Sequence, residues 1–197
     1  TEEELTYLAK SGSHVIKTSR RDIPIIVSKG LDGATTVSAT MYIASLAKIK
    51  IFATGGIGGV HRGAEITMDI SADLDEFAKT NVAVVCAGAK AILDLGKTLE
   101  YLETKGVPVI GYQTKILPAF YTRNSEYRVD YQMDTPDEIA KMLKVKWDLG
   151  LNGGVLITNP IPYDASLDEN LMNEAINKAL DEAKEKQIKG KDITPYL

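Results

Sequence analysis

Short apolar runs alternate with longer amphipathic segments along this chain, and the alternation predicts its secondary structure. Apolar runs predict strands at residues 14–18, 49–54, 82–86, 107–111 and 155–158. Helical spacing predicts helices at residues 2–10, 22–29, 35–47, 73–80, 90–95, 135–147 and 167–186, and residues 97–104 either continue the helix that starts at residue 90 or form another. Because strands and helices alternate with short connections, we expect an α/β fold, a mostly parallel sheet with helices on both faces. The simplest organisation is a single α/β domain over residues 1–197.

Two of the apolar runs, residues 49–54 and 82–86, are continuous rather than alternating. A parallel strand that is covered on both faces has this pattern, so both runs are predicted to be central strands. Thr135, Pro136 and Glu138 carry the N-cap, N1 and N3 signals of a helix start. A helix is therefore expected to begin there.

The composition is typical of a folded protein from a reducing compartment. With 44% hydrophobic and 25% charged residues, the chain can bury a core and keep a solvated surface. The net charge of −4 gives no basic footprint for a nucleic-acid polymer. Cys86 is the only cysteine, and the longest apolar runs are far short of the roughly 20 residues that cross a membrane. We expect a cytoplasmic protein with small-molecule partners.

Residues 54–63 form a glycine-rich run, Thr-Gly-Gly-Ile-Gly-Gly-Val-His-Arg-Gly, directly after a predicted strand. In open α/β sheets, ligands bind beyond the carboxyl ends of the strands, and glycines there let backbone N–H groups approach an anion. His61 and Arg62 add donors. The spacing fits neither the P-loop nor the dinucleotide pattern. The run is therefore either a ligand-binding loop or a tight structural loop.

Asp69, Ser71 and Asp73 bring two carboxylates and a hydroxyl close together in the sequence. Oxygen ligands select Mg²⁺ or Mn²⁺ over Zn²⁺, so one interpretation is a cation or sugar site. The other is that Ser71 or Asp73 caps a helix, which is a common use of these residues.

Lys90 follows an apolar strand through the small residues Ala87, Gly88 and Ala89. A lysine held among apolar neighbours loses solvation, which lowers its pKa and exposes a nucleophilic amine that can form an imine with a sugar carbonyl carbon. The alternative is an exposed lysine in the first turn of a helix. Cys86 is interpreted as a small core residue rather than a nucleophile.

A basic segment, Lys17 to Asp22, ends the first predicted strand with three cations and two hydroxyls. Such a group can hold a phosphate, and the N–H groups that open the helix at residues 35–38 can complete an anion site. The alternative is a solvated surface cluster.

Together these runs are similar to one family, the pseudouridine-5′-phosphate glycosidases, also named the indigoidine synthase A-like family. The matching stretches are residues 19–22, 33–37, 52–65, 69–74, 85–90, 99–104, 106–112, 118–120 and 159–162. They cover essentially the whole chain. The resemblance implies reversible cleavage of the C–C glycosidic bond of pseudouridine 5′-phosphate to uracil and ribose 5-phosphate. It also implies a divalent cation, normally Mn²⁺, a three-layer α/β/α fold and a homotrimer.

The resemblance also implies roles for individual residues. Lys90 matches the nucleophilic lysine that forms a Schiff base, and Asp69 matches the metal ligand. The substrate positions are matched by Lys17, Val37, Ser71, Ala72 and Asp73, with Lys17 on the phosphate. His61 matches a residue near the ribose or base.

Two features of the family have no match in these 197 residues: an N-terminal segment with a general-acid glutamate, and a C-terminal segment with an Asn-Asn pair near the active site. The chain also begins at Thr1 without an initiator Met. We therefore expect that it lacks these segments and, by itself, the general acid. Two other functions stay open: an imine-forming, aldolase-like enzyme for another phosphosugar, and a phosphosugar- or nucleotide-binding module.

Overall fold

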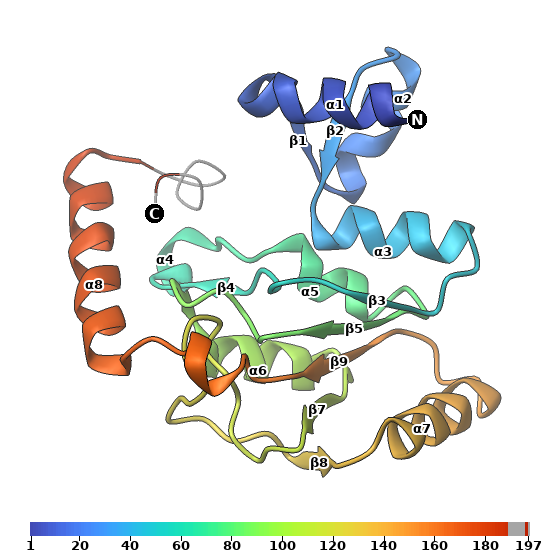
Figure 1. Ribbon diagram of the computed structural model, residues 1–197, viewed down its shortest axis with the longest axis vertical. Coiled ribbons are helices and arrows are strands. Elements are labelled where there is room, and N and C mark those ends of the chain that lie inside the picture. The colour runs from blue at the N-terminus through green and yellow to red at the C-terminus, as the bar shows by residue number, and fades with distance from the viewer. Residues whose placement is uncertain (189–195, 197) are drawn as a thin grey trace.

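The computed structural model describes residues 1–188 and 196, and its centre is a five-stranded parallel sheet. The strand order is β3 (Ile51–Ala53), β5 (Ala83–Cys86), β9 (Val155–Thr158), β7 (Val109–Tyr112) and β8 (Tyr131–Met133). All four neighbouring pairs are parallel. The mostly parallel α/β fold expected from the sequence is confirmed (Figure 1).

Alternate residues of the central strands face two separate helical layers. On one face, Val84 and Leu156 pack in a core with α3 (Val37–Leu46), α5 (Ala72–Phe77) and α6 (Leu95–Thr104). On the other face, Ala83 and Ile157 pack against α7 (Pro136–Asp148). This period of two divides the side chains of one strand between two cores. The three-layer α/β/α arrangement follows from it.

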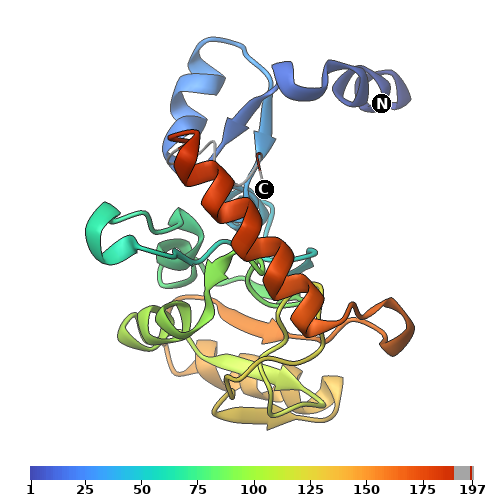
Figure 2. The ribbon, with the colours of Figure 1, turned by 90° about the vertical axis from the view of Figure 1, so that its left-hand side faces the viewer.

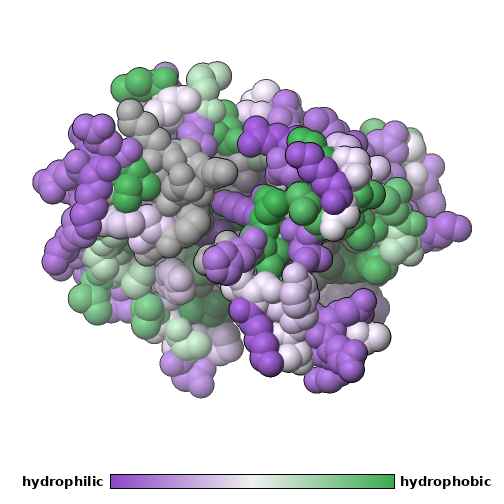
Figure 3. Space-filling view, turned by 90° about the horizontal axis from the view of Figure 1, so that it is seen from above, coloured by the Kyte–Doolittle hydropathy of each residue, from purple (hydrophilic) through white to green (hydrophobic). Residues whose placement is uncertain are grey.

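A small N-terminal lobe, residues 1–35, stands beyond α3 in Figure 1. It contains α1 (Glu2–Ser11), η1 (Gly12–His14), β1 (Ile16–Thr18), η2 (Arg20–Asp22), α2 (Ile23–Ser28) and β2 (Gly33–Thr35). Strands β1 and β2 form a two-stranded parallel sheet. Helix α1 begins with a capping box between Thr1 and Glu4 but buries none of its residues. Figure 3 shows apolar side chains mixed with hydrophilic ones on this end of the molecule.

Helix α8 (Glu169–Glu185) lies beside the sheet and rises from the level of β9 toward the N-terminal lobe (Figures 1 and 2). It follows the short helix η3 (Tyr163–Ala165), and Asp168 caps its first turn. The Arg62 guanidinium donates to the Asn177 side chain at 2.9 Å, which joins the glycine-rich loop to α8. In the part of the chain that the structure describes, no helix is both long enough and apolar enough to span a membrane.

Two of the sequence predictions are wrong, and both concern the region of the proposed chemistry. Strand β3 is an edge strand, not a central one, and Ile51 is 50% exposed. The helix expected from residue 90 begins only at Leu95, because Asp94 caps it by accepting from the Lys97 N–H. No sequence pattern predicted the strands β2 and β8, the paired strands β4 (Val60–His61) and β6 (Leu93–Asp94), or the short helix α4 (Ala64–Thr67).

Candidate functional site

The glycine-rich loop continues the pairing of β3 with β5 past the ends of both strands. Ile57 N–H donates to the Gly88 carbonyl, and Lys90 N–H donates to the Ile57 carbonyl, both at 3.1 Å. Ala87 N–H donates to the Gly55 carbonyl in the same way. The loop and the segment that carries Lys90 therefore lie side by side at the carboxyl ends of the strands, where ligands bind in open α/β sheets.

Two glycines allow close approaches in this region. Gly88 has φ of 98°, and an added Cβ would overlap the Pro118 carbonyl. A Cβ on Gly58 would overlap the Ser71 hydroxyl. Only glycine fits such backbone and contact demands without strain. Gly58 thus brings the glycine-rich loop against the start of α5, and Gly88 brings the segment before Lys90 against Pro118.

Lys90 is partly buried and lies in an irregular segment just before β6, not in a helix. Burial lowers the pKa of its ammonium group, the positive charge of Lys17 lowers this pKa further, and Asp73 acts in the opposite direction. Lys17 therefore lies within electrostatic reach of Lys90, although the two residues belong to different lobes. A lysine with a lowered pKa has a larger neutral fraction at physiological pH, which is the form that attacks carbon.

His61 and Asp69 face each other beside these lysines. The His61 Nδ1 atom lies 3.9 Å from the Asp69 Oδ2 atom, and His61 N–H donates to the Asp69 carbonyl at 3.0 Å. Burial lowers the pKa of His61, while Asp69 raises it and the charges of Lys17 and Lys90 lower it again. Four of the residues expected from the sequence, Lys17, His61, Asp69 and Lys90, thus share one electrostatic environment.

The protein donors near Asp69 limit the kind of metal site that fits. Within residues 1–188 and 196, no group of three or more His, Cys, Asp or Glu side chains is placed to hold a metal ion. One carboxylate with an imidazole beside it does not fit a structural Zn²⁺ site, which needs four protein ligands. It fits a hard divalent cation of the Mg²⁺ or Mn²⁺ type that keeps most of its ligands as water or substrate oxygens.

Asp73 connects three elements of the site through its carboxylate. Its Oδ1 atom accepts from Ser38 N–H of α3 at 2.8 Å, and its Oδ2 atom accepts from Gly58 N–H at 2.9 Å. Asp73 is itself buried in the first turn of α5. The helix cap is Ser71, whose hydroxyl accepts from Asp73 N–H, so Asp73 does not cap its own helix. It instead holds the N-terminus of α3 against the glycine-rich loop.

The remaining substrate positions implied by the resemblance lie around this carboxylate. Val37 is the first residue of α3, next to Ser38, and packs against the main core. Ala72 is the exposed first residue of α5. Their backbone groups lie at the two helix N-termini nearest to Asp73.

The basic segment divides into residues with different uses. Lys17 lies exposed on β1. Arg20 instead donates from Nη1 to both Glu76 carboxylate oxygens, at 2.7 and 2.9 Å. Arg21 is 85% exposed, and its Nε atom lies 3.5 Å from the carboxylate of its neighbour Asp22. The three cations of this segment are therefore not equivalent, because Arg20 is engaged with a buried carboxylate.

Two residues at this edge of the sheet were missed. Phe120 has φ of 65°, an unusual conformation for a bulky side chain, and its N–H donates to the Ala87 carbonyl at 3.0 Å. A Cβ on Gly55 would contact its ring, and a Cβ on Gly56 would overlap it. Tyr121 packs edge-on against it, with ring centroids 4.5 Å apart. Only the short Pro-Ala-Phe run at residues 118–120 offered a signal for it.

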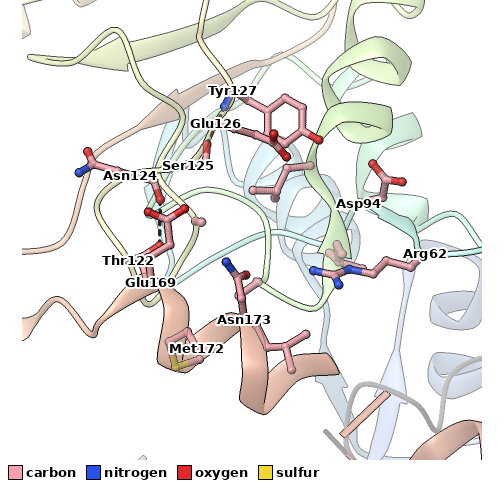
Figure 4. Close-up of a pocket in the computed structure, with 15 residues that line it drawn as sticks. Arg62, Asp94, Thr122, Asn124, Ser125, Glu126, Tyr127, Glu169, Met172 and Asn173 are labelled. Atoms are coloured by element: carbon pink, nitrogen blue, oxygen red, sulfur yellow. Dashed lines mark hydrogen bonds between the residues drawn. The ribbon is translucent and has the colours of Figure 1, made fainter. Parts of the chain in front are cut away.

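A cavity of about 490 Å³ lies next to the site, between α8 and the loop of residues 119–127. Arg62 and Ala91, the neighbours of His61 and Lys90 in the chain, line one side. Figure 4 shows Arg62 and Asp94 on one side of this cavity and Asn173 of α8 across from them. Cys86 is buried at the end of β5. Burial raises the pKa of its thiol to about 12, so Cys86 is a core residue, as expected.

These features define a parallel α/β protein with a lysine-centred candidate site at the carboxyl ends of its strands. The whole chain, residues 1–197, matches the family described as indigoidine synthase A like protein. The chain belongs to this family, which confirms the resemblance seen in the sequence.

Curated relatives carry one shared description. The chain is 63% identical to the pseudouridine-5′-phosphate glycosidase of Clostridium botulinum (strain Langeland) over 197 residues, which is all of this chain and 64% of that protein. It is 61% identical to the protein of that description from Hahella chejuensis, again over all of this chain and 65% of the relative. The chain therefore spans somewhat less than two thirds of the length of these relatives.

Two solved structures share the fold. One is the prealnumycin C-glycosynthase AlnA in complex with ribulose 5-phosphate, which is 44% identical and has a TM-score of 0.87 over 92% of this chain and 60% of that one. The other is an indigoidine synthase A-like protein from Thermotoga maritima, which is 33% identical with a TM-score of 0.89 over 100% of this chain and 63% of that one.

Proposed function

We propose that this chain carries the active-site lysine of a cytoplasmic, homotrimeric pseudouridine-5′-phosphate glycosidase. Its substrate is split reversibly into uracil and ribose 5-phosphate. The observation that carries the proposal is Lys90, a partly buried lysine with a lowered pKa beside a second cation. The 63% identity to a protein described as this glycosidase supports the choice of substrate. Half-exposed apolar side chains on α3 and β3, including Ile43 and Ile51, support self-association.

The chemistry must solve the problem that carbon is a poor leaving group. The neutral amine of Lys90 attacks C1′ of the ribose, and the C1′–O4′ bond breaks while an acid protonates O4′. The nitrogen then expels the base: the bond from C1′ to uracil breaks, its electron pair leaves with uracil, and a C1′=Nζ imine remains. Uracil takes up a proton at carbon, and water hydrolyses the imine to free ribose 5-phosphate and Lys90.

The other residues hold the substrate in place for this attack. In the proposal, Lys17 binds the phosphate, and that distant contact positions C1′ against Lys90. The structural relative that holds ribulose 5-phosphate supports a pentose phosphate as the ligand of this fold. A divalent cation held by Asp69 would supply charge stabilisation near the ribose hydroxyls. His61, with a lowered pKa, remains a neutral hydrogen-bonding group beside Asp69.

The direct test, made on a protein that includes the N-terminal segment of the family, is release of uracil from pseudouridine 5′-phosphate in the presence of Mn²⁺, measured by chromatography. We expect free uracil and ribose 5-phosphate in equal amounts, no cleavage of the N-glycoside uridine 5′-phosphate, and loss of activity with a chelator. Asp69→Asn should lower the response to added Mn²⁺. Cleavage of other phosphosugars without release of uracil would instead favour an aldolase-like enzyme.

A second prediction concerns pH. Because the charge of Lys17 lowers the pKa of Lys90, Lys17→Met should raise that pKa and reduce the neutral amine at a given pH. The alkaline-rising limb of kcat/KM, which reports the free enzyme, should therefore move to higher pH. Lys29→Met removes a charge from the same lobe at the end of α2 and is the matched control. An unmoved limb in Lys17→Met would contradict the electrostatic coupling of the two lysines.

A further inference from the structure

The N-terminal lobe has little core of its own to fix its position. The main apolar core contains no residue before Val37, and within the lobe only Thr18 and Ile26 are buried among the described residues. The lobe is continuous with α3 through β2. Its position relative to the sheet must therefore depend on a few specific contacts.

One side chain makes the connection from the lobe to the sheet layer. Within residues 1–188, two side-chain hydrogen bonds connect the lobe to an element beyond α3. Both run from Arg20 on η2 to Glu76 on α5. The Arg20 guanidinium also lies 4.8 Å from the centre of the Tyr42 ring of α3. Arg20 thus joins η2, α3 and α5 at one point.

The partner of Arg20 is strongly fixed. Glu76 is 2% exposed, and its carboxylate also accepts from the Thr80 hydroxyl. A buried carboxylate without a charged partner lowers the stability of the folded protein. The ion pair with Arg20 therefore fixes the position of the Arg20 side chain against α5. Lys17 lies three residues before Arg20, on the strand that precedes η2.

We propose that Arg20 is a positioning residue: its ion pair with Glu76 holds the N-terminal lobe so that Lys17 faces Lys90 across the site. The inference rests on the proposed function, because it assigns Lys17 to the phosphate. Arg20 acts through Lys17 and does not touch the substrate. If Arg20 were a phosphate ligand, its side chain would be free to point into the site. If its ion pair were purely structural, losing it would change only the stability of the protein.

The test compares Arg20→Met with Arg21→Met, which removes the adjacent, exposed cation and is the matched control. In Arg20→Met we expect kcat/KM for pseudouridine 5′-phosphate to fall about tenfold, mainly through KM, because a displaced Lys17 contributes less binding energy. Hydrogen exchange should speed up in β1 and β2 but not in β5. Arg21→Met should match the wild type in all of these measurements.

The pH profile separates positioning from direct phosphate binding. The influences on the pKa of Lys90 are burial, Lys17 and Asp73, and Arg20 is not among them; His61 is the other titrating group of this cluster. If Arg20→Met displaces Lys17, the alkaline-rising limb moves to higher pH. A raised KM with this limb and the β1 exchange unchanged would show a phosphate ligand and overturn the proposal.

Arg20→Lys keeps the charge but loses the planar guanidinium, and we expect intermediate values of KM and of hydrogen exchange. If Arg20→Met does not fold, this variant and its control Arg21→Lys decide the matter by the same measurements. Wild-type kinetics on Arg20→Lys, with unchanged exchange in β1, would overturn the proposal. A wild-type protein that releases no uracil would refute the proposed function, while faster exchange of β1 in Arg20→Met would still show that Arg20 holds the lobe.

Discussion

Lys90→Met should abolish covalent capture of the substrate. When the wild-type protein is mixed with ribose 5-phosphate and reduced with borohydride, we expect its mass to rise by one reduced pentose phosphate, attached at Lys90. Methionine has a similar shape but no amine, so the variant should gain no such mass. Uracil release should fall by roughly a thousandfold or more, as it does when a covalent nucleophile is removed elsewhere.

The matched control for this experiment is Lys97→Met. Lys97 is exposed on α6 and paired with Glu65 at 2.6 Å, and hydrogen bonds to Glu65 and Asp94 raise its pKa. It is therefore a protonated amine with no nucleophilic character, and its loss should leave the adduct intact. An adduct that persists in Lys90→Met, or that maps to another lysine in the wild type, would rule out Lys90 as the nucleophile.

The contrast between these two lysines shows what the sequence could not supply. Lys90 was predicted to be reactive because small and apolar residues precede it, and the lowered pKa agrees with that reasoning. The contribution of Lys17 depends on an electrostatic interaction between residues more than seventy positions apart, which no local pattern contains. The role of Lys90 as the nucleophile was implied only by the family resemblance of residues 85–90.

The strands show the same division between local and long-range information. Residues 82–86 were predicted as a central strand and lie between β3 and β9. Residues 49–54 have the same continuous apolar pattern, yet β3 lies at the edge. An apolar run indicates that the faces of a strand are buried or favour burial. The order of the strands in the sheet is set by tertiary packing, which a local run does not contain. The half-exposed Ile51 is therefore compatible with a surface that a partner covers.

The wrong helix start at Lys90 has a different cause. Residues 90–95 have good helical composition, but Lys90 N–H is already bound to the Ile57 carbonyl. Leu93 and Asp94 then pair with His61 and Val60 as β6 and β4. In residues 90–94, hydrogen bonds to the glycine-rich loop therefore outweigh the local helix propensity. Asp94 caps the helix where it begins in the structure, at Leu95.

Asp73→Ala should be the most destabilising single change in the site. The substitution removes an acceptor from two backbone N–H groups, those of Ser38 and Gly58, in a buried setting. Hydrogen bonds to a charged group contribute about 1.5 to 3 kcal/mol each, and unpaired buried donors are penalised, so we expect a loss of about 3 kcal/mol. Urea denaturation monitored by circular dichroism measures it. Asp73→Asn retains one acceptor oxygen and should lose less.

Asp75→Ala is the control, because Asp75 lies on the same helix but is 42% exposed and pairs with Lys105 at 2.8 Å on the surface. An exposed pair of this kind contributes about 0.5 kcal/mol. Asp73→Asn should also move the alkaline-rising limb of kcat/KM to lower pH, because Asp73 raises the pKa of Lys90. This shift is opposite to that of Lys17→Met. Equal destabilisation by Asp73→Ala and Asp75→Ala would show that the buried carboxylate does not hold α3 against the glycine-rich loop.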